Sequence, residues 1–114
     1  MLTIEKLEKF GCDYKEGLNR CLNNESFYFK MIEKAMNQTS FNDLEKALKQ
    51  KQLEEAFYIA HSLKGVFGNL SITPIYNLVV ELTELLREKK DMDYSPYLNK
   101  LNILVNEFKE IINS

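Results

Sequence analysis

The one histidine of the chain, His61, is followed by residues that are unusual in the interior of a helix. Lys64, Gly65 and Gly68 stand three, four and seven positions after it, the spacings that share one face of a helix. A neutral imidazole is a nucleophile, and a lysine one turn away can stabilise an anion that the imidazole carries. A histidine, a cation and a flat glycine surface together indicate a site that exposes a phosphoryl group to another protein.

The two glycines need an explanation, because each costs a helix interior roughly 1 kcal/mol relative to alanine. Gly65 and Gly68 both lie off the centre of the apolar stripe of their segment. Close approach by something outside the molecule is therefore the better interpretation for the pair. Simpler interpretations stay open: a lone histidine is more often structural, and a lysine such as Lys64 is usually just solvated.

Other catalytic constellations are missing from the sequence. Ser62 follows His61 directly, so their side chains diverge around a helix and acyl transfer is not expected. No glycine-rich loop is present to hold a nucleotide. Cys12, Cys21 and His61 give three ligands, one fewer than a structural zinc site needs. We therefore expect no cofactor and no metal bound by this chain alone.

The segment that carries His61, from about residue 52 to 70, has the clearest helical pattern of the chain. Its apolar residues follow one another at spacings of three and four; they are Leu53, Ala56, Ala60, Leu63, Phe67 and Leu70. At about 100° per residue, His61 lies roughly 130° from the direction of this stripe. The imidazole is therefore predicted on the side of the protein, away from the core.

The same periodicity predicts helices through most of the chain. They cover residues 2–10, 13–22, 25–37, 40–49, 52–70, 73–89 and 95–112. Residues with capping side chains stand at the start of four of them, namely Asp13, Ser40, Thr73 and Ser95, and the last two are followed by proline. Short connections favour antiparallel neighbours. We predict an all-α protein, an up-and-down antiparallel four-helix bundle with additional short N-terminal helices.

Composition narrows the class of protein. A chain of 114 residues is one domain and too short to hold a kinase with its own ATP fold. The net charge is −2 and no basic stripe exists, so no nucleic-acid partner is expected. The sequence shows neither a signal peptide nor an apolar run of membrane length, which predicts a cytoplasmic protein with reduced cysteines. The lysine- and asparagine-rich composition is compatible with an AT-rich bacterial genome.

Around His61 the sequence resembles a known family, the histidine-containing phosphotransfer (HPt) domains. The resemblance rests on the residues AHSLKG at 60–65, then Asn69-Leu70, and a carboxylate at Glu81 or Glu84 on the next predicted helix. The stretch 13–28 also resembles the segment that these domains carry ahead of their bundle. The resemblance extends over about residues 13–112 and implies a single HPt-like domain over 1–114, with the core bundle at about 25–113.

The resemblance implies a role for each residue that matches the motif. His61 would accept the phosphoryl group on a ring nitrogen, and Lys64 would help to neutralise it. Gly65 and Gly68 would leave room for the active-site loop of the partner.

Two positions depart from the family pattern. Ser71 stands where the family usually has glycine, which bears on the turn after the phosphorylated helix. Thr83 stands where many members place glutamine or glutamate near the imidazole, which leaves the partner that orients His61 open. A partly apolar docking surface is expected around the histidine, although core packing is an equal alternative for its candidates. They are Phe57, Tyr58, Tyr76, Val80 and Thr83.

The implied function is that of a histidine phosphotransfer protein in a two-component phosphorelay. Such a protein accepts a phosphoryl group from a receiver aspartate or a histidine kinase and passes it to the aspartate of a response-regulator receiver domain, which supplies Mg²⁺. It is a phosphocarrier without kinase activity of its own, and a monomer is expected.

Two alternatives remain open at the level of the sequence. One is a non-catalytic helical adaptor in signalling with a structural histidine. The other is a relative of the phosphate-accepting module of chemotaxis-type kinases, which differs from a relay protein in its donor and not in its histidine site.

Overall fold

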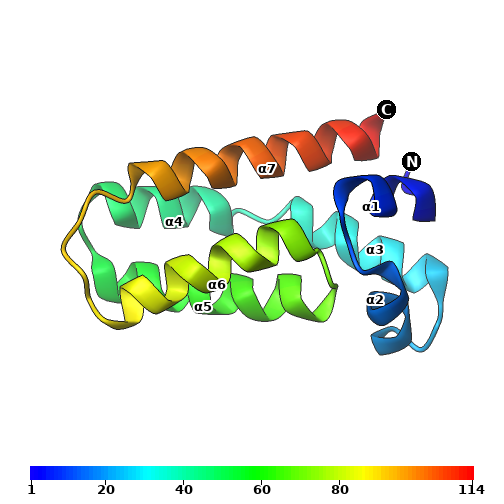
Figure 1. Ribbon diagram of the computed structural model, residues 1–114, viewed down its shortest axis with the longest axis horizontal. Helices are drawn as coiled ribbons and strands as arrows, with labels where there is room; N and C mark the ends of the chain where they lie inside the picture. The colour runs from blue at the N-terminus through cyan, green and yellow to red at the C-terminus, as the bar shows by residue number, and fades with distance from the viewer.

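The computed structural model describes all 114 residues, and its regular elements are seven α-helices, which confirms the all-α prediction. Figure 1 shows them in chain order from blue to red. Their bounds are α1 Ile4–Phe10, α2 Tyr14–Arg20, α3 Glu25–Met36, α4 Ser40–Lys49, α5 Leu53–Asn69, α6 Thr73–Arg87 and α7 Ser95–Asn113. None of these helices is both long and apolar enough to cross a membrane.

Helices α4 to α7 form a bundle in which consecutive helices run in opposite directions along the long axis of the molecule (Figure 1). Helix α5 packs mainly against α6 and also against α4, and α6 packs against α7. Helix α3 precedes α4 roughly in line with it, and α1 and α2 lie at one end of the bundle. The residues of the predicted site lie on the long, closely packed helices α5 and α6.

The inner faces of the helices supply one continuous core. The apolar stripe of α5 is buried from Ala56 onward as its periodicity predicts, and Leu53 at its start is half-buried. Ala56, Ala60 and Phe67 are fully inaccessible to solvent. Phe108 of α7 is also fully buried, and its ring stacks on Phe10 of α1 with centroids 4.4 Å apart. Burial of these large side chains supplies most of the driving force for folding.

The four helices with predicted capping residues begin at or next to those residues, but only one of the four residues caps its helix. Asp13 caps α2, because its carboxylate accepts a hydrogen bond from the backbone N–H of Glu16. The capping role predicted for the other three residues is wrong, since each is instead the first helical residue and no side-chain cap is formed. These residues are Ser40, Thr73 and Ser95. The two prolines that follow Thr73 and Ser95 do occupy the first turn of their helices, where a missing N–H costs nothing.

Helix α5 ends in a turn that depends on a left-handed backbone at Ser71, whose φ is 54°. The N–H of Ser71 donates to the carbonyl of Gly68 at 3.1 Å, and the N–H of Ile72 donates to that of Phe67 at 3.0 Å. This pair of bonds is the Schellman motif, whose left-handed position is most often glycine. The serine that departs from the family pattern thus takes the backbone conformation that a glycine would take there.

The N-terminal helices hold this same turn. The backbone N–H of Asp13 donates to the carbonyl of Ser71 at 3.1 Å, and the buried hydroxyl of Tyr28 donates to the carbonyl of Leu70 at 2.6 Å. One guanidinium nitrogen of Arg20 donates to the Gly68 carbonyl at 2.6 Å and to the Ser71 hydroxyl at 3.0 Å. The N-cap residue of α2 and the helices α2 and α3 therefore hold the end of α5, two turns beyond the histidine.

Candidate functional site

His61 lies in the middle of α5 with its imidazole exposed to solvent, as its place on the helix predicts. Its neighbours Ala60 and Leu63 are buried and anchor this stretch of α5 in the core. No side chain or backbone group of the protein forms a hydrogen bond with either ring nitrogen of His61; the polar groups on the facing helix bond elsewhere. Both nitrogens are therefore free to meet a group from outside.

The imidazole has an aromatic neighbour one turn earlier on the same helix. The ring of Phe57 lies nearly parallel to it, with centroids 5.8 Å apart and planes inclined by 19°. The guanidinium carbon of Arg87, at the end of α6, lies 5.1 Å from the centroid of Phe57. Arg87 also pairs with Glu84 at 3.4 Å. The side chains of Glu84, Arg87 and Phe57 thus form a row that leads from α6 to the imidazole.

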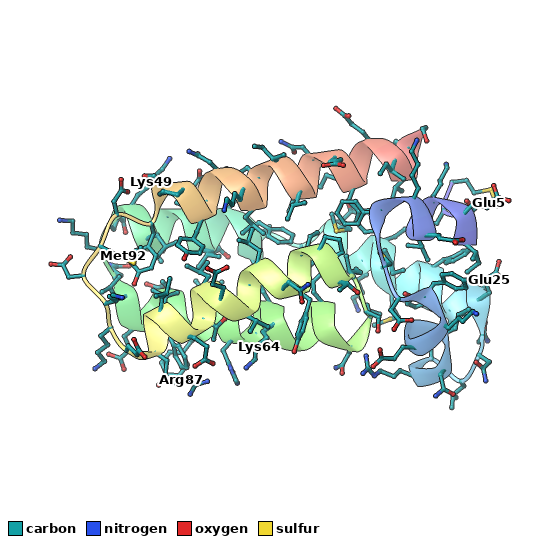
Figure 2. All side chains as sticks on the ribbon, in the orientation of Figure 1. Glu5, Glu25, Lys49, Lys64, Arg87 and Met92 are labelled. Carbon is teal, nitrogen blue, oxygen red and sulfur yellow. The ribbon has the colours of Figure 1, made fainter.

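Lys64 lies one turn after the histidine and is half-buried. Its ammonium group forms no ion pair and no hydrogen bond within the protein. Figure 2 shows Lys64 and Arg87 along the same edge of the α5–α6 pair. Arg87 is paired with Glu84, whereas the charge of Lys64, one turn from His61, is not neutralised by a carboxylate.

The two glycines of α5 differ in their surroundings. A Cβ added at Gly65 would meet no atom within 4 Å, so this glycine leaves open space beside the histidine. A Cβ at Gly68 would lie 2.7 Å from a ring carbon of Tyr76. The Tyr76 ring from α6 already requires a glycine at position 68, so packing within the protein explains Gly68, and its role in admitting an outside partner stays a prediction.

The prediction that Thr83 belongs to a docking surface is wrong, because the residue is inaccessible to solvent. Its side chain is fully buried, and its hydroxyl donates to the carbonyl of Val79 at 2.7 Å within α6. It does not replace the glutamine or glutamate that would orient the imidazole. The two carboxylates on α6 are engaged elsewhere as well: Glu81 accepts from the hydroxyl of Tyr97 at 3.1 Å, a bond that raises the pKa of the tyrosine, and Glu84 pairs with Arg87.

The other docking candidates reach the surface to different degrees. Tyr58 is the most accessible of them, with 63% of its surface exposed. Phe57, Tyr76 and Val80 are half-buried, so each has both a packing contact and an accessible edge. The structure leaves the docking role of these four residues a prediction.

A groove of about 700 Å³, lined mostly by polar residues and glycines, begins one turn after His61 and extends to the N-terminal helices. Lys64, Gly65 and Tyr76 line the side formed by α5 and α6. Asp13 and Arg20 line the opposite side, and sequence patterns gave no reason to place them near the histidine, since they precede it by more than 40 residues. The surface near the candidate site is thus shaped partly by helices outside the bundle.

No group of three or more histidine, cysteine, aspartate or glutamate side chains is arranged to hold a metal ion. Cys12 and Cys21 are both buried free thiols. Burial raises the pKa of Cys12 from its ordinary 9.0 to about 12, an effect that a backbone hydrogen bond with Thr73 partly offsets. Such a thiol is protonated at neutral pH and is a poor nucleophile.

In a comparison with known protein families, the model of the Hpt domain matches residues 34–111. The chain belongs to the Hpt domain family. The matched region runs from the end of α3 almost to the end of α7 and contains all of α5 and α6. No curated protein and no solved structure matches the chain.

Membership in the Hpt domain family indicates the general function of the domain. Hpt domains have a phosphotransfer role in two-component signalling, where they interact with kinase and receiver domains. They are phosphocarrier modules rather than catalytic enzymes. Residues 1–33, which contain α1, α2 and most of α3, lie outside the matched part.

Proposed function

We propose that this Hpt domain is a histidine phosphotransfer protein of a two-component phosphorelay. His61 accepts a phosphoryl group from a receiver aspartate or a histidine kinase and passes it to the aspartate of a response-regulator receiver domain. The observation that carries the proposal is the setting of His61: an exposed imidazole with unbonded nitrogens, an unpaired cation at Lys64 and open space at Gly65.

The proposed transfer is a displacement at phosphorus. One nitrogen of the neutral imidazole donates its lone pair to the phosphorus of an aspartyl phosphate, and a nitrogen–phosphorus bond forms. The phosphorus–oxygen bond to the aspartate breaks, and its electron pair stays on the carboxylate. The proton on the other ring nitrogen of His61 remains in place, so no separate base is needed. Transfer onward to a receiver runs through the same step in reverse.

In such a transfer this chain contributes position and charge. Helix α5 holds the nucleophile at a fixed place on a rigid element, which lowers the entropic part of the barrier. The ammonium group of Lys64 stabilises the negative charge on the phosphoryl oxygens. We expect the receiver domain to supply both the aspartate and Mg²⁺, which would neutralise the remaining charge.

The open space at Gly65 would admit the active-site loop of a receiver close to the imidazole, since no Cβ stands in its way. The exposed ring of Tyr58 and the accessible edges of Phe57, Tyr76 and Val80 would give that contact its apolar part. A monomeric Hpt domain binding one partner at a time suits this single exposed site.

The function is tested by intact-mass measurement after incubation with a phosphorylated receiver domain and Mg²⁺. The wild type is expected to gain one phosphoryl group that is lost in acid and retained in base, as a phosphoramidate bond is. His61→Gln, a variant of similar size at an exposed position, is expected to gain none while keeping its helical circular dichroism. An adduct of equal yield on His61→Gln would contradict the proposal, and a folded wild type that gains no adduct from several receivers and kinases would leave the adaptor hypothesis in its place.

A further inference from the structure

We infer that Phe57 is a positioning residue for His61: its ring holds the imidazole by stacking, and Arg87 from α6 holds the ring of Phe57. The role rests on the proposed phosphotransfer by His61. It replaces an orienting hydrogen bond, which the side chains around this imidazole do not supply.

The need for such a residue follows from the polar groups near the histidine. The Thr83 hydroxyl is bonded inside α6, Glu81 accepts from Tyr97, and Glu84 pairs with Arg87. An exposed imidazole without a hydrogen bond can rotate about both of its side-chain torsions. A nucleophile that samples many orientations reacts more slowly than one held near the attacking geometry.

The contact that restrains the imidazole is the stack on Phe57. The two rings are one helical turn apart, their centroids are 5.8 Å apart, and their planes are within 19° of parallel. An offset parallel arrangement of this kind is one of the favoured geometries of aromatic pairs. His61 remains exposed beside this stack, and neither of its ring nitrogens is hydrogen-bonded within the protein.

The ring of Phe57 is itself held in place from the neighbouring helix. The guanidinium carbon of Arg87 lies 5.1 Å from the ring centroid, within the range of a cation–π contact, and Glu84 orients Arg87 at 3.4 Å. Phe57 is half-buried, whereas His61 is exposed. The less mobile ring therefore restrains the more mobile one.

The position can be tested without a protein partner by using phosphoramidate, a small phosphoryl donor, and following phosphohistidine by intact mass. Phe57→Leu keeps the apolar bulk and removes the stacking partner; phosphorylation is expected to slow by about three- to tenfold, the factor that corresponds to an ordinary aromatic pair. Phe57→Tyr keeps a ring that can stack and is expected to restore most of the rate. Phe27→Leu, which removes an exposed phenylalanine ring on α3, is the matched control and is expected to leave the rate unchanged.

A spectroscopic signature separates positioning from general packing. In the wild type and in Phe57→Tyr, the ring current of residue 57 is expected to shift the imidazole C–H proton resonances of His61 upfield. In Phe57→Leu this shift is expected to disappear while the thermal midpoint stays close to that of Phe57→Tyr.

Each result decides between distinct claims. A rate for Phe57→Leu equal to that of the wild type with phosphoramidate would overturn the positioning role and leave phosphotransfer by His61 intact. A rate that falls with a phosphorylated receiver but not with phosphoramidate would assign Phe57 to docking and would also overturn it. Failure of the wild type to form phosphohistidine with any donor would contradict the proposed function itself.

Discussion

Gly65 and Gly68 lie one turn apart on the same helix, and their surroundings give them different roles. The first faces open space beside His61, whereas the second faces the ring of Tyr76 from α6. Helical spacing predicted that both share the face of the histidine, and it could not predict which of them a neighbouring side chain covers. That distinction depends on the path of α6 and on the rotamer of Tyr76, and the periodicity of α5 predicts neither of them.

The two glycines should therefore respond in opposite ways to the same substitution. Gly65→Ala is expected to raise the free energy of unfolding by about 0.5–1 kcal/mol, because alanine is the better helix former and has room. Gly68→Ala is expected to lower it by about 1–3 kcal/mol, because the new Cβ displaces the Tyr76 ring. Urea unfolding of the two variants measures both effects.

The open space at Gly65 should also matter for phosphotransfer from a protein donor. Gly65→Ala is expected to slow phosphotransfer from a receiver while leaving phosphorylation by phosphoramidate unchanged, because only the protein donor needs the open space. A Gly65→Ala variant that accepts from receivers as fast as the wild type would show that this space is not used for docking.

Helices α4, α5 and α6 are each followed by a residue with a left-handed backbone conformation, and none of these residues is glycine. Lys51, Ser71 and Lys89 have φ between 52° and 56°, and the residue after each donates its N–H five residues back, as in a Schellman motif. The sequence predicted these ends to within two residues from the loss of apolar periodicity. It could not predict the left-handed turns themselves, because the usual marker, a glycine after the helix, is absent.

A glycine at one of these positions should stabilise the protein. Lys51 is exposed and forms no ion pair, so Lys51→Gly removes little but the strain of its left-handed backbone. Glycine relieves the strain of the left-handed backbone, but it also increases the conformational entropy of the unfolded chain. The net effect expected is a rise of about 0.5–1 kcal/mol in the free energy of unfolding. The matched control is Lys46→Gly in the interior of α4, which is expected to lose about 1 kcal/mol. Equal losses in both variants would contradict the left-handed assignment.

In the molecule as a whole, residues outside the family match stabilise the helix that carries the site. Asp13, Arg20 and Tyr28 all donate to backbone carbonyls at the end of α5. The sequence predicted the helices that contain these residues and the bundle they join. It did not predict where α2 packs, because hydrogen bonds to carbonyls that are distant in the chain leave no periodic pattern in a sequence.

The buried thiol of Cys12, in the link between α1 and α2, makes this N-terminal packing sensitive to alkali. Its pKa is raised in the folded protein to about 12, against an ordinary 9.0, so the unfolded chain releases this proton first as the pH rises. The contribution to stability is complete below pH 9 and is lost as the pH rises toward 12.

Between pH 8 and pH 10 the wild type is therefore expected to lose about 1 kcal/mol more unfolding free energy than Cys12→Ala, which has no thiol to ionise. Urea unfolding of both proteins at a series of pH values measures the difference. Parallel profiles for the two proteins would contradict the assignment of a raised pKa to Cys12.

The central claim is that His61 both accepts and gives up a phosphoryl group. The most direct test starts from a receiver domain phosphorylated with radiolabelled phosphate, adds this Hpt domain, and then adds a second, unphosphorylated receiver with Mg²⁺. The account predicts that the label passes to the wild type and on to the second receiver, and that His61→Gln breaks the sequence at its first step. Label that reaches the second receiver equally well with His61→Gln, or that never enters the wild type from any donor, would contradict it.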